Sequence, residues 1–132
     1  MKFWKQILLF YLGGMAYTGV ELLWRGRTHG SMFLLGGACF VALGRLRRLR
    51  LPLPVAALMG SAIVTAGELA VGLLVNRGYA VWDYRAMPVN FQGQICLAYS
   101  LLWMPVSLFA MGLYGLLDRK ISEIQLKNTG FY

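Results

Sequence analysis

The sequence predicts an all-α membrane protein in which four transmembrane helices form two repeated helical hairpins. Three observations support this fold class. Hydrophobic residues make up 58% of the 132 positions, more than a soluble domain of this size can bury. The apolar residues gather in long runs, and the basic residues lie between those runs. The first and third runs also share a polar pattern, which indicates a repeat.

The apolar runs predict one integral membrane domain over residues 1–132. A membrane helix needs about 20 mostly apolar residues, and the runs place the spans at about 3–24, 31–44, 51–75 and 95–117. Lys2 and Lys5 precede the first run as they would in a signal peptide. No small-residue cleavage site follows, so we expect this run to be a retained span. Pro52 and Pro54 stand at the start of the third run, where prolines disturb a helix least.

The distribution of Lys and Arg predicts the orientation. With four spans, the side of the membrane that holds both termini carries nine basic residues and the other side carries four. The nine are Lys2, Lys5, Arg45, Arg47, Arg48, Arg50, Arg119, Lys120 and Lys127, and the four are Arg25, Arg27, Arg77 and Arg85. Because basic loops stay inside, both termini are expected in the cytoplasm of a multi-pass protein of the inner (plasma) membrane.

The repeat becomes visible when the first run is shifted by 47 residues onto the third. Gly14 then aligns with Ser61, Thr18 with Thr65, and Glu21 with Glu68. In each run the three positions share one helical face. Parallel repeats of this kind are common in transporters. The loop after the third run is longer than its counterpart, and the extra residues are rich in polar groups.

Composition also excludes several classes of function. The net charge of +8 could indicate a nucleic-acid partner, but its placement between apolar runs favours a role in topology. Cys39 and Cys96 lie in apolar runs and are interpreted as buried thiols. No metal-binding spacing and no phosphate-binding glycine loop is present. We therefore expect no cofactor, no metal and no ATPase activity in this chain.

Two acidic residues lie within predicted spans, where a charge is costly and usually functional. Glu21 has Arg25 four residues on, so an ion pair within the helix would satisfy it. Glu68 has no such neighbour. Its partner is expected to be Arg25, Arg27 or Arg77 on another part of the fold, another subunit, or a ligand.

The stretch "GYAVWDYRAMPVNFQGQICLAYS" at 78–100 concentrates polar groups beside an apolar run. One interpretation is an interfacial aromatic belt beside a solvated acid. The other is an ordered cap on the helix bundle, with aromatic residues at the interface and Asp83, Asn90 and Gln94 pointing inward. The candidate ligand-binding residues are Glu21, Thr65, Glu68, Trp82, Asp83, Tyr84, Asn90 and Gln94, and no catalytic residue is assigned.

This stretch resembles the ABC-transporter type IV family of small bacterial membrane proteins, and "SMFLLGGACF" is similar to the family's second span. The residues that carry the resemblance are Glu68, Gly78, Trp82, Asp83, Tyr84, Pro88, Asn90, Gly93, Gln94, Ile95, Cys96, Leu97, Ser100 and Trp103. Arg85 departs from the family, which often has Ser there. The resemblance implies a multi-helix inner-membrane protein.

These observations favour a protein that handles a small solute or ion, as a transporter or a transporter component. Four short helices enclose little volume, so we expect a homo-oligomer packed through small residues such as Ala62, Ala66 and Ala70. Membrane lipids are expected contacts, and another membrane protein is an alternative partner. Two other functions remain open: a membrane-embedded enzyme that uses Glu68 and Asp83 on a lipid or lipid-linked substrate, and an accessory subunit of another complex.

Overall fold

The computed structural model describes residues 2–26, 29–79 and 81–129. Its described part contains four helices: α1 (Lys2–Arg25), α2 (Gly30–Arg47), α3 (Leu53–Val75) and α4 (Leu97–Thr129). Between α3 and α4 lies a hairpin of two short strands, β1 (Asn90–Phe91) and β2 (Ile95–Cys96). All four helices are long and apolar enough to cross a membrane, which confirms the predicted number of spans.

The last helix is longer than the sequence predicts. α4 has 33 residues and ends at Thr129, well past the expected end at residue 117. A helix of this length measures about 50 Å, whereas the hydrocarbon layer of a bilayer is about 30 Å thick. Charged residues begin at Asp118. The end of α4 therefore projects beyond the apolar layer as a helix.

The hairpin before α4 corrects the predicted start of the fourth span. Residues 95 and 96 were expected to begin the fourth span, but they pair with β1 in an antiparallel ladder that joins Asn90 to Cys96 and Phe91 to Ile95. Gln92 and Gly93 turn the chain with φ of 54° and 68°. Because these left-handed conformations cannot continue into an α-helix, the helix begins only after β2.

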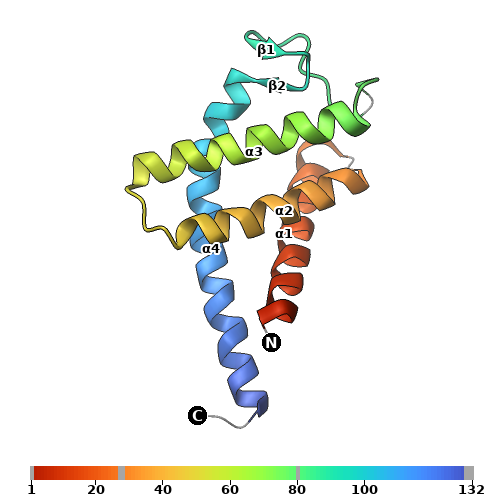
Figure 1. Ribbon diagram of the computed structural model, residues 1–132. Coiled ribbons are helices and arrows are strands. Elements are labelled where there is room, and N and C mark those ends of the chain that lie inside the picture. Colours follow the sequence, from red (N-terminus) through yellow and green to blue (C-terminus); the bar gives the residue numbers. More distant parts are fainter. Residues whose placement is uncertain (1, 27–28, 80, 130–132) are drawn as a thin grey trace.

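The helices pack mainly as consecutive pairs, α1 on α2 and α3 on α4, with further contacts from α2 to α3 and α4. Figure 1 shows α2 and α3 side by side, running across α4 rather than along it. A Cβ atom at Gly13 would collide with Phe40, and one at Gly37 would collide with Phe10. These glycines therefore allow α1 and α2 to approach closely.

The two ends of the molecule differ in character. The first turn of α1 and the last turns of α4 lie at one end, and the β-hairpin lies at the other (Figure 1). At the former end Lys5 Nζ forms an ion pair of 2.8 Å with Asp118 Oδ1, which ties α1 to α4. These contacts do not say which end faces the cytoplasm. The cytoplasmic position of both termini and the repeat of two hairpins therefore stay predictions.

Candidate functional site

The carboxylate of Glu68 lies at the centre of the site. It is carried by α3, and the residue is only 2% exposed. Oε1 accepts a hydrogen bond of 2.7 Å from Nε1 of Trp103 on α4, and Oε2 accepts one of 3.2 Å from the Tyr84 hydroxyl. Both donors are neutral. Among the described side chains, the ion pairs join Lys5 to Asp118 and Arg85 to Asp83, and neither involves Glu68.

The two aromatic side chains that contact this carboxylate each pack against another ring. Tyr84 stacks on Tyr99, with ring centroids 4.9 Å apart and an interplanar angle of 14°. Trp103 lies against Tyr17 of α1, with centroids 6.3 Å apart. Burial raises the pKa of the Tyr84 hydroxyl, and the nearby Glu68 carboxylate raises it further. This hydroxyl therefore keeps its proton and acts as a donor.

Hydroxyl groups continue the polar stripe toward the middle of the α3–α4 interface. Thr65 lies one turn before Glu68, and its Oγ1 is 2.8 Å from the Ser100 hydroxyl. The Ser61 hydroxyl donates to the Ser100 carbonyl. The predicted stripe of Ser61, Thr65 and Glu68 thus faces α4. Its partners on α4 are Ser100 and Trp103.

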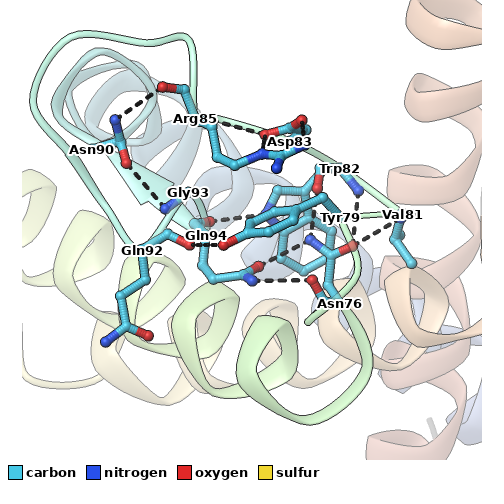
Figure 2. Close-up of polar contacts among 10 residues, drawn as sticks. All are labelled: Asn76, Tyr79, Val81, Trp82, Asp83, Arg85, Asn90, Gln92, Gly93 and Gln94. Atoms are coloured by element: carbon cyan, nitrogen blue, oxygen red, sulfur yellow. Dashed lines mark hydrogen bonds and ion pairs between the residues drawn. The ribbon is translucent and has the colours of Figure 1, made fainter.

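The loop from α3 to α4 is anchored by two buried amides. Asn76, at the end of α3, donates from Nδ2 to Gln94 Oε1 at 2.9 Å, and Gln94 Nε2 donates to the Asn76 carbonyl at 3.0 Å (Figure 2). Asn76 Oδ1 also accepts from the backbone N–H groups of Val81 and Trp82. A Cβ atom on Gly72 would collide with Gln94, so glycine is needed for this close approach.

Trp82 holds the same loop from the other side. It is 3% exposed, and its indole Nε1 donates a 2.8 Å hydrogen bond to the Gln94 carbonyl. Its ring packs with Met32 of α2 and with Val81. These contacts, together with the amide pair, make residues 81–96 an ordered cap at the end of the helices (Figure 2).

The outer surface of this cap carries the charges. Asp83 accepts two hydrogen bonds from the Arg85 guanidinium, at 2.9 and 2.8 Å, and one from the Arg85 backbone N–H at 2.9 Å. Arg85 also lies 4.0 Å from the centre of the Tyr79 ring. These bonds lower the pKa of Asp83 to about 2. Asn90 closes the turn by accepting from Gly93 N–H and donating to the Met87 carbonyl.

The predicted cap is therefore ordered, but several of its side chains face the opposite way. Asp83 and Asn90 were expected to point inward and instead are exposed. Trp82 and Tyr84 were expected at the interface, yet Trp82 is buried and Tyr84 reaches Glu68. Only Gln94 lies inside as predicted. The reason is energetic, since two large rings gain more from burial than an acid that can pair with Arg85 in water.

Only some of the side chains predicted to pair with Glu21 and Glu68 belong to the described residues. Glu21 is half-buried on α1, and the side chain of its expected partner Arg25 lies outside the described residues, as does Arg27. Arg77 follows the end of α3 and forms no ion pair with Glu68; its Nε donates to the Leu73 carbonyl of α3. A joint acid/base role for Glu68 and Asp83 is not supported, since one is buried against Tyr84 and Trp103 and the other is exposed beside Arg85.

Two residues of the site were missed as candidates. Trp103 belongs to the residues that carry the family resemblance, but its indole was not recognised as a donor to Glu68. Asn76 follows the last turn of α3, where an asparagine often ends a helix. That position was the signal that could have identified it. For Tyr99, which also contacts the site through Tyr84, the sequence contained no such signal, because that contact depends on how the loop folds.

Comparison with known proteins identifies the family of the chain. A family model described as "Putative ABC-transporter type IV" matches residues 15–131, which include the whole of α2, α3, the cap and the site. No match was found among curated proteins or among solved structures. The match covers well over half of the chain, and all four helices can cross a membrane. The chain is therefore a multi-pass membrane protein that belongs to the putative ABC-transporter type IV family.

Proposed function

We propose that this protein transports a small solute or ion across the inner (plasma) membrane, alone or as a component of a larger transporter, with Glu68 as the charged binding group. One observation carries the proposal. The Glu68 carboxylate is buried within a span and contacts neutral donors, with no cationic partner among the described side chains. The family's transporter description supports the same reading.

The energetics of the site support a binding role. A carboxylate at membrane depth is costly, and a structural acid lowers that cost by pairing with Arg or Lys. Among the side chains that the structure describes, Glu68 instead accepts from one indole and one phenol. Such donors orient the carboxylate and leave its charge uncompensated. A group of this kind can bind a proton or a cationic solute reversibly.

We further propose that the protein functions as a homo-oligomer. Ala62, Ala66 and Ala70 form a row along α3, and all three are exposed in the single chain. Small residues allow helices to approach closely in lipid, where apolar burial alone gives no advantage. The row lies on the face of α3 turned away from Glu68, so a second copy would pack against the outer side of the helix that carries the site.

The test uses purified protein in proteoliposomes loaded with a pH-sensitive dye. Candidate solutes are added one at a time, and both solute uptake and internal pH are followed. Flux is expected with the unmodified protein, lost in Glu68→Gln and retained in Asp83→Asn, a matched change at an exposed acid. Absence of flux from folded protein would overturn the proposal. Turnover of lipid extract would then indicate an enzyme, and co-purification with a membrane complex would indicate an accessory subunit.

A further inference from the structure

We propose that the Glu68 site selects bulky organic cations, of the quaternary ammonium or phosphonium type, and that such a cation and a proton compete for the carboxylate. This inference rests on the proposed function and names its substrate class. Three features lead to it: the sign of the charge, the chemistry of the neighbouring groups, and the position of the aromatic rings relative to the surface.

The sign of the charge requires a cation or a proton. Glu68 is the acid at the centre of the site, and the side chains that donate hydrogen bonds to it, Tyr84 and Trp103, are uncharged. Two further titratable groups lie near enough to interact with it electrostatically, the acid Glu21 on α1 and the Cys39 thiol on α2, and neither adds positive charge. An anionic substrate would be repelled by the carboxylate, and a neutral one would leave its charge uncompensated at membrane depth. A cation compensates it directly.

The neighbouring groups do not suit a small inorganic cation. Ca²⁺ takes six to eight oxygen ligands, and Mg²⁺ takes six. The described residues contain no group of three or more His, Cys, Asp or Glu side chains that could hold a metal ion. The nearest partner of the carboxylate is an indole N–H, which donates and cannot ligate. The oxygen atoms near the carboxylate are the Tyr84 hydroxyl and, one turn away, the Thr65 and Ser100 hydroxyls, which are fewer than Ca²⁺ or Mg²⁺ takes.

The same neighbours suit an organic cation. Tyr84 and Trp103 contact the carboxylate, and each packs against a further ring, Tyr99 of α4 and Tyr17 of α1 respectively. Aromatic faces attract cations, and Trp and Tyr cages are the usual means of recognising quaternary ammonium groups. A cation without N–H groups needs no hydrogen-bond acceptors beyond the carboxylate. Charge and rings together describe a ligand that is positive and apolar.

The rings also connect the carboxylate to the outside of the chain. Glu68 is buried, whereas Tyr84, Tyr99 and Trp103 are half-buried and reach the surface. On either side of Trp103, the side chains of Leu101, Leu102 and Val106 on α4 are exposed, as expected for a surface in contact with lipid. A lipophilic cation that has entered the bilayer could therefore approach along the rings without crossing the cap.

Competition with a proton follows from charge balance. When the carboxyl group holds a proton, the site is neutral and has no charge to offer a cation. When the cation binds, the O–H bond breaks, the proton leaves to solvent, and the carboxylate forms an ion pair with the cation. One proton is released for each cation that binds to the protonated form, and none is released when the carboxylate is already ionised. No other reactant is needed.

The test measures binding of radiolabelled tetraphenylphosphonium to the purified protein by equilibrium dialysis between pH 6 and 9. Saturable binding is expected, and in the range where Glu68 is protonated the apparent Kd should rise by up to about tenfold for each unit of falling pH. Glu68→Gln should weaken binding at least about tenfold and remove the pH dependence, whereas Asp83→Asn should change neither. Unsaturable binding, or equal binding by Glu68→Gln, would overturn the inference.

A matched pair at Tyr99 tests the rings separately from the charge. Tyr99→Phe keeps the ring and should bind like the unmodified protein, whereas Tyr99→Leu should bind between about twofold and thirtyfold more weakly. Equal binding by both variants would remove the aromatic part of the proposal, and this pair remains informative if Glu68→Gln fails to fold. If another solute shows Glu68-dependent flux while tetraphenylphosphonium does not bind, this inference fails and the proposed function stands.

Discussion

The indole N–H of Trp103 donates a 2.7 Å hydrogen bond to the carboxylate of Glu68, across 35 positions of sequence. Helix α4 thereby supplies the shortest contact to the buried acid of α3. A bond between a neutral donor and a charged acceptor is stronger than one between two neutral groups. It orients the carboxylate and links the two helices that flank the cap.

Removal of this bond is expected to destabilise the protein. Trp103→Phe keeps an aromatic ring but leaves Oε1 of Glu68 without its donor, at a cost of about 1–3 kcal/mol. Unfolding in detergent micelles with increasing sodium dodecyl sulfate measures the change. Trp4→Phe is the control, because Trp4 is 68% exposed and should tolerate the change. Equal stability of the two variants would contradict a structural contribution from this bond.

The cap should loosen when its contact with α3 is blocked. Gly72→Ala places a methyl group where Gln94 packs, so the amide pair with Asn76 must shift. Hydrogen–deuterium exchange measured by mass spectrometry should then show faster exchange in peptides covering residues 81–96. Gly78→Ala is the matched control, because a Cβ atom there meets nothing within 4 Å. Unchanged exchange in Gly72→Ala would show that Gln94 can move without loss of the cap.

The ion pair on the cap predicts a distinct titration. Arg85 lowers the pKa of Asp83 from 3.8 to about 2. Because the folded-state pKa lies below the ordinary value, the pair contributes stability at pH values above 3.8 and loses it as the pH falls through about 2. Carboxyl carbon chemical shifts of Asp83 measured by NMR should show a midpoint near 2. In Arg85→Ala the midpoint should rise toward 3.8, and a midpoint already near 3.8 in the unmodified protein would refute the pairing.

The topology prediction can be tested by cysteine labelling from outside intact cells. Arg48→Cys changes an exposed residue at the end of α2 and should be protected, because the basic loop is expected in the cytoplasm. Ala86→Cys changes an exposed residue of the cap and should be labelled. Background labelling is measured on the parent, in which Cys96 is buried and Cys39 is half-buried. The reverse labelling pattern would show that the protein has the opposite orientation in the membrane.

The oligomer prediction concerns the exposed alanine row of α3. Mass determination in nanodiscs should give more than one chain, and Ala66→Leu should shift the population toward monomer because a larger side chain separates closely packed helices. Ala38→Leu is the matched control on α2, where the alanine is also exposed. A monomer in the unmodified protein would contradict the prediction, and an equal effect of both substitutions would place the interface elsewhere.

The sequence predicted those parts of the site that depend on local position. Glu68, Thr65 and Ser61 share one face of a helix wherever that helix packs, so their alignment followed from spacing alone. An ordered cap was also predictable, since residues 79–92 contain few flexible positions and amides that require partners. The direction in which the side chains of the cap point was not predictable, because Tyr79, Val89 and Gln92 adopt φ of 59°, 51° and 54°. Such left-handed positions change the direction of the chain, so the side chains do not alternate between two faces as they do along a regular strand.

By itself, the sequence determined that this chain has four segments long and apolar enough to cross a membrane and carries an acid within the third of them. Both are local properties, since the choice between lipid and water depends on about 20 consecutive residues and not on what they touch. Only the tertiary structure decided that Glu68 would be held by Trp103 and Tyr84, and that Asp83 would face outward. These outcomes depend on contacts between distant segments, where burial of two aromatic rings outweighs burial of an acid that can pair at the surface.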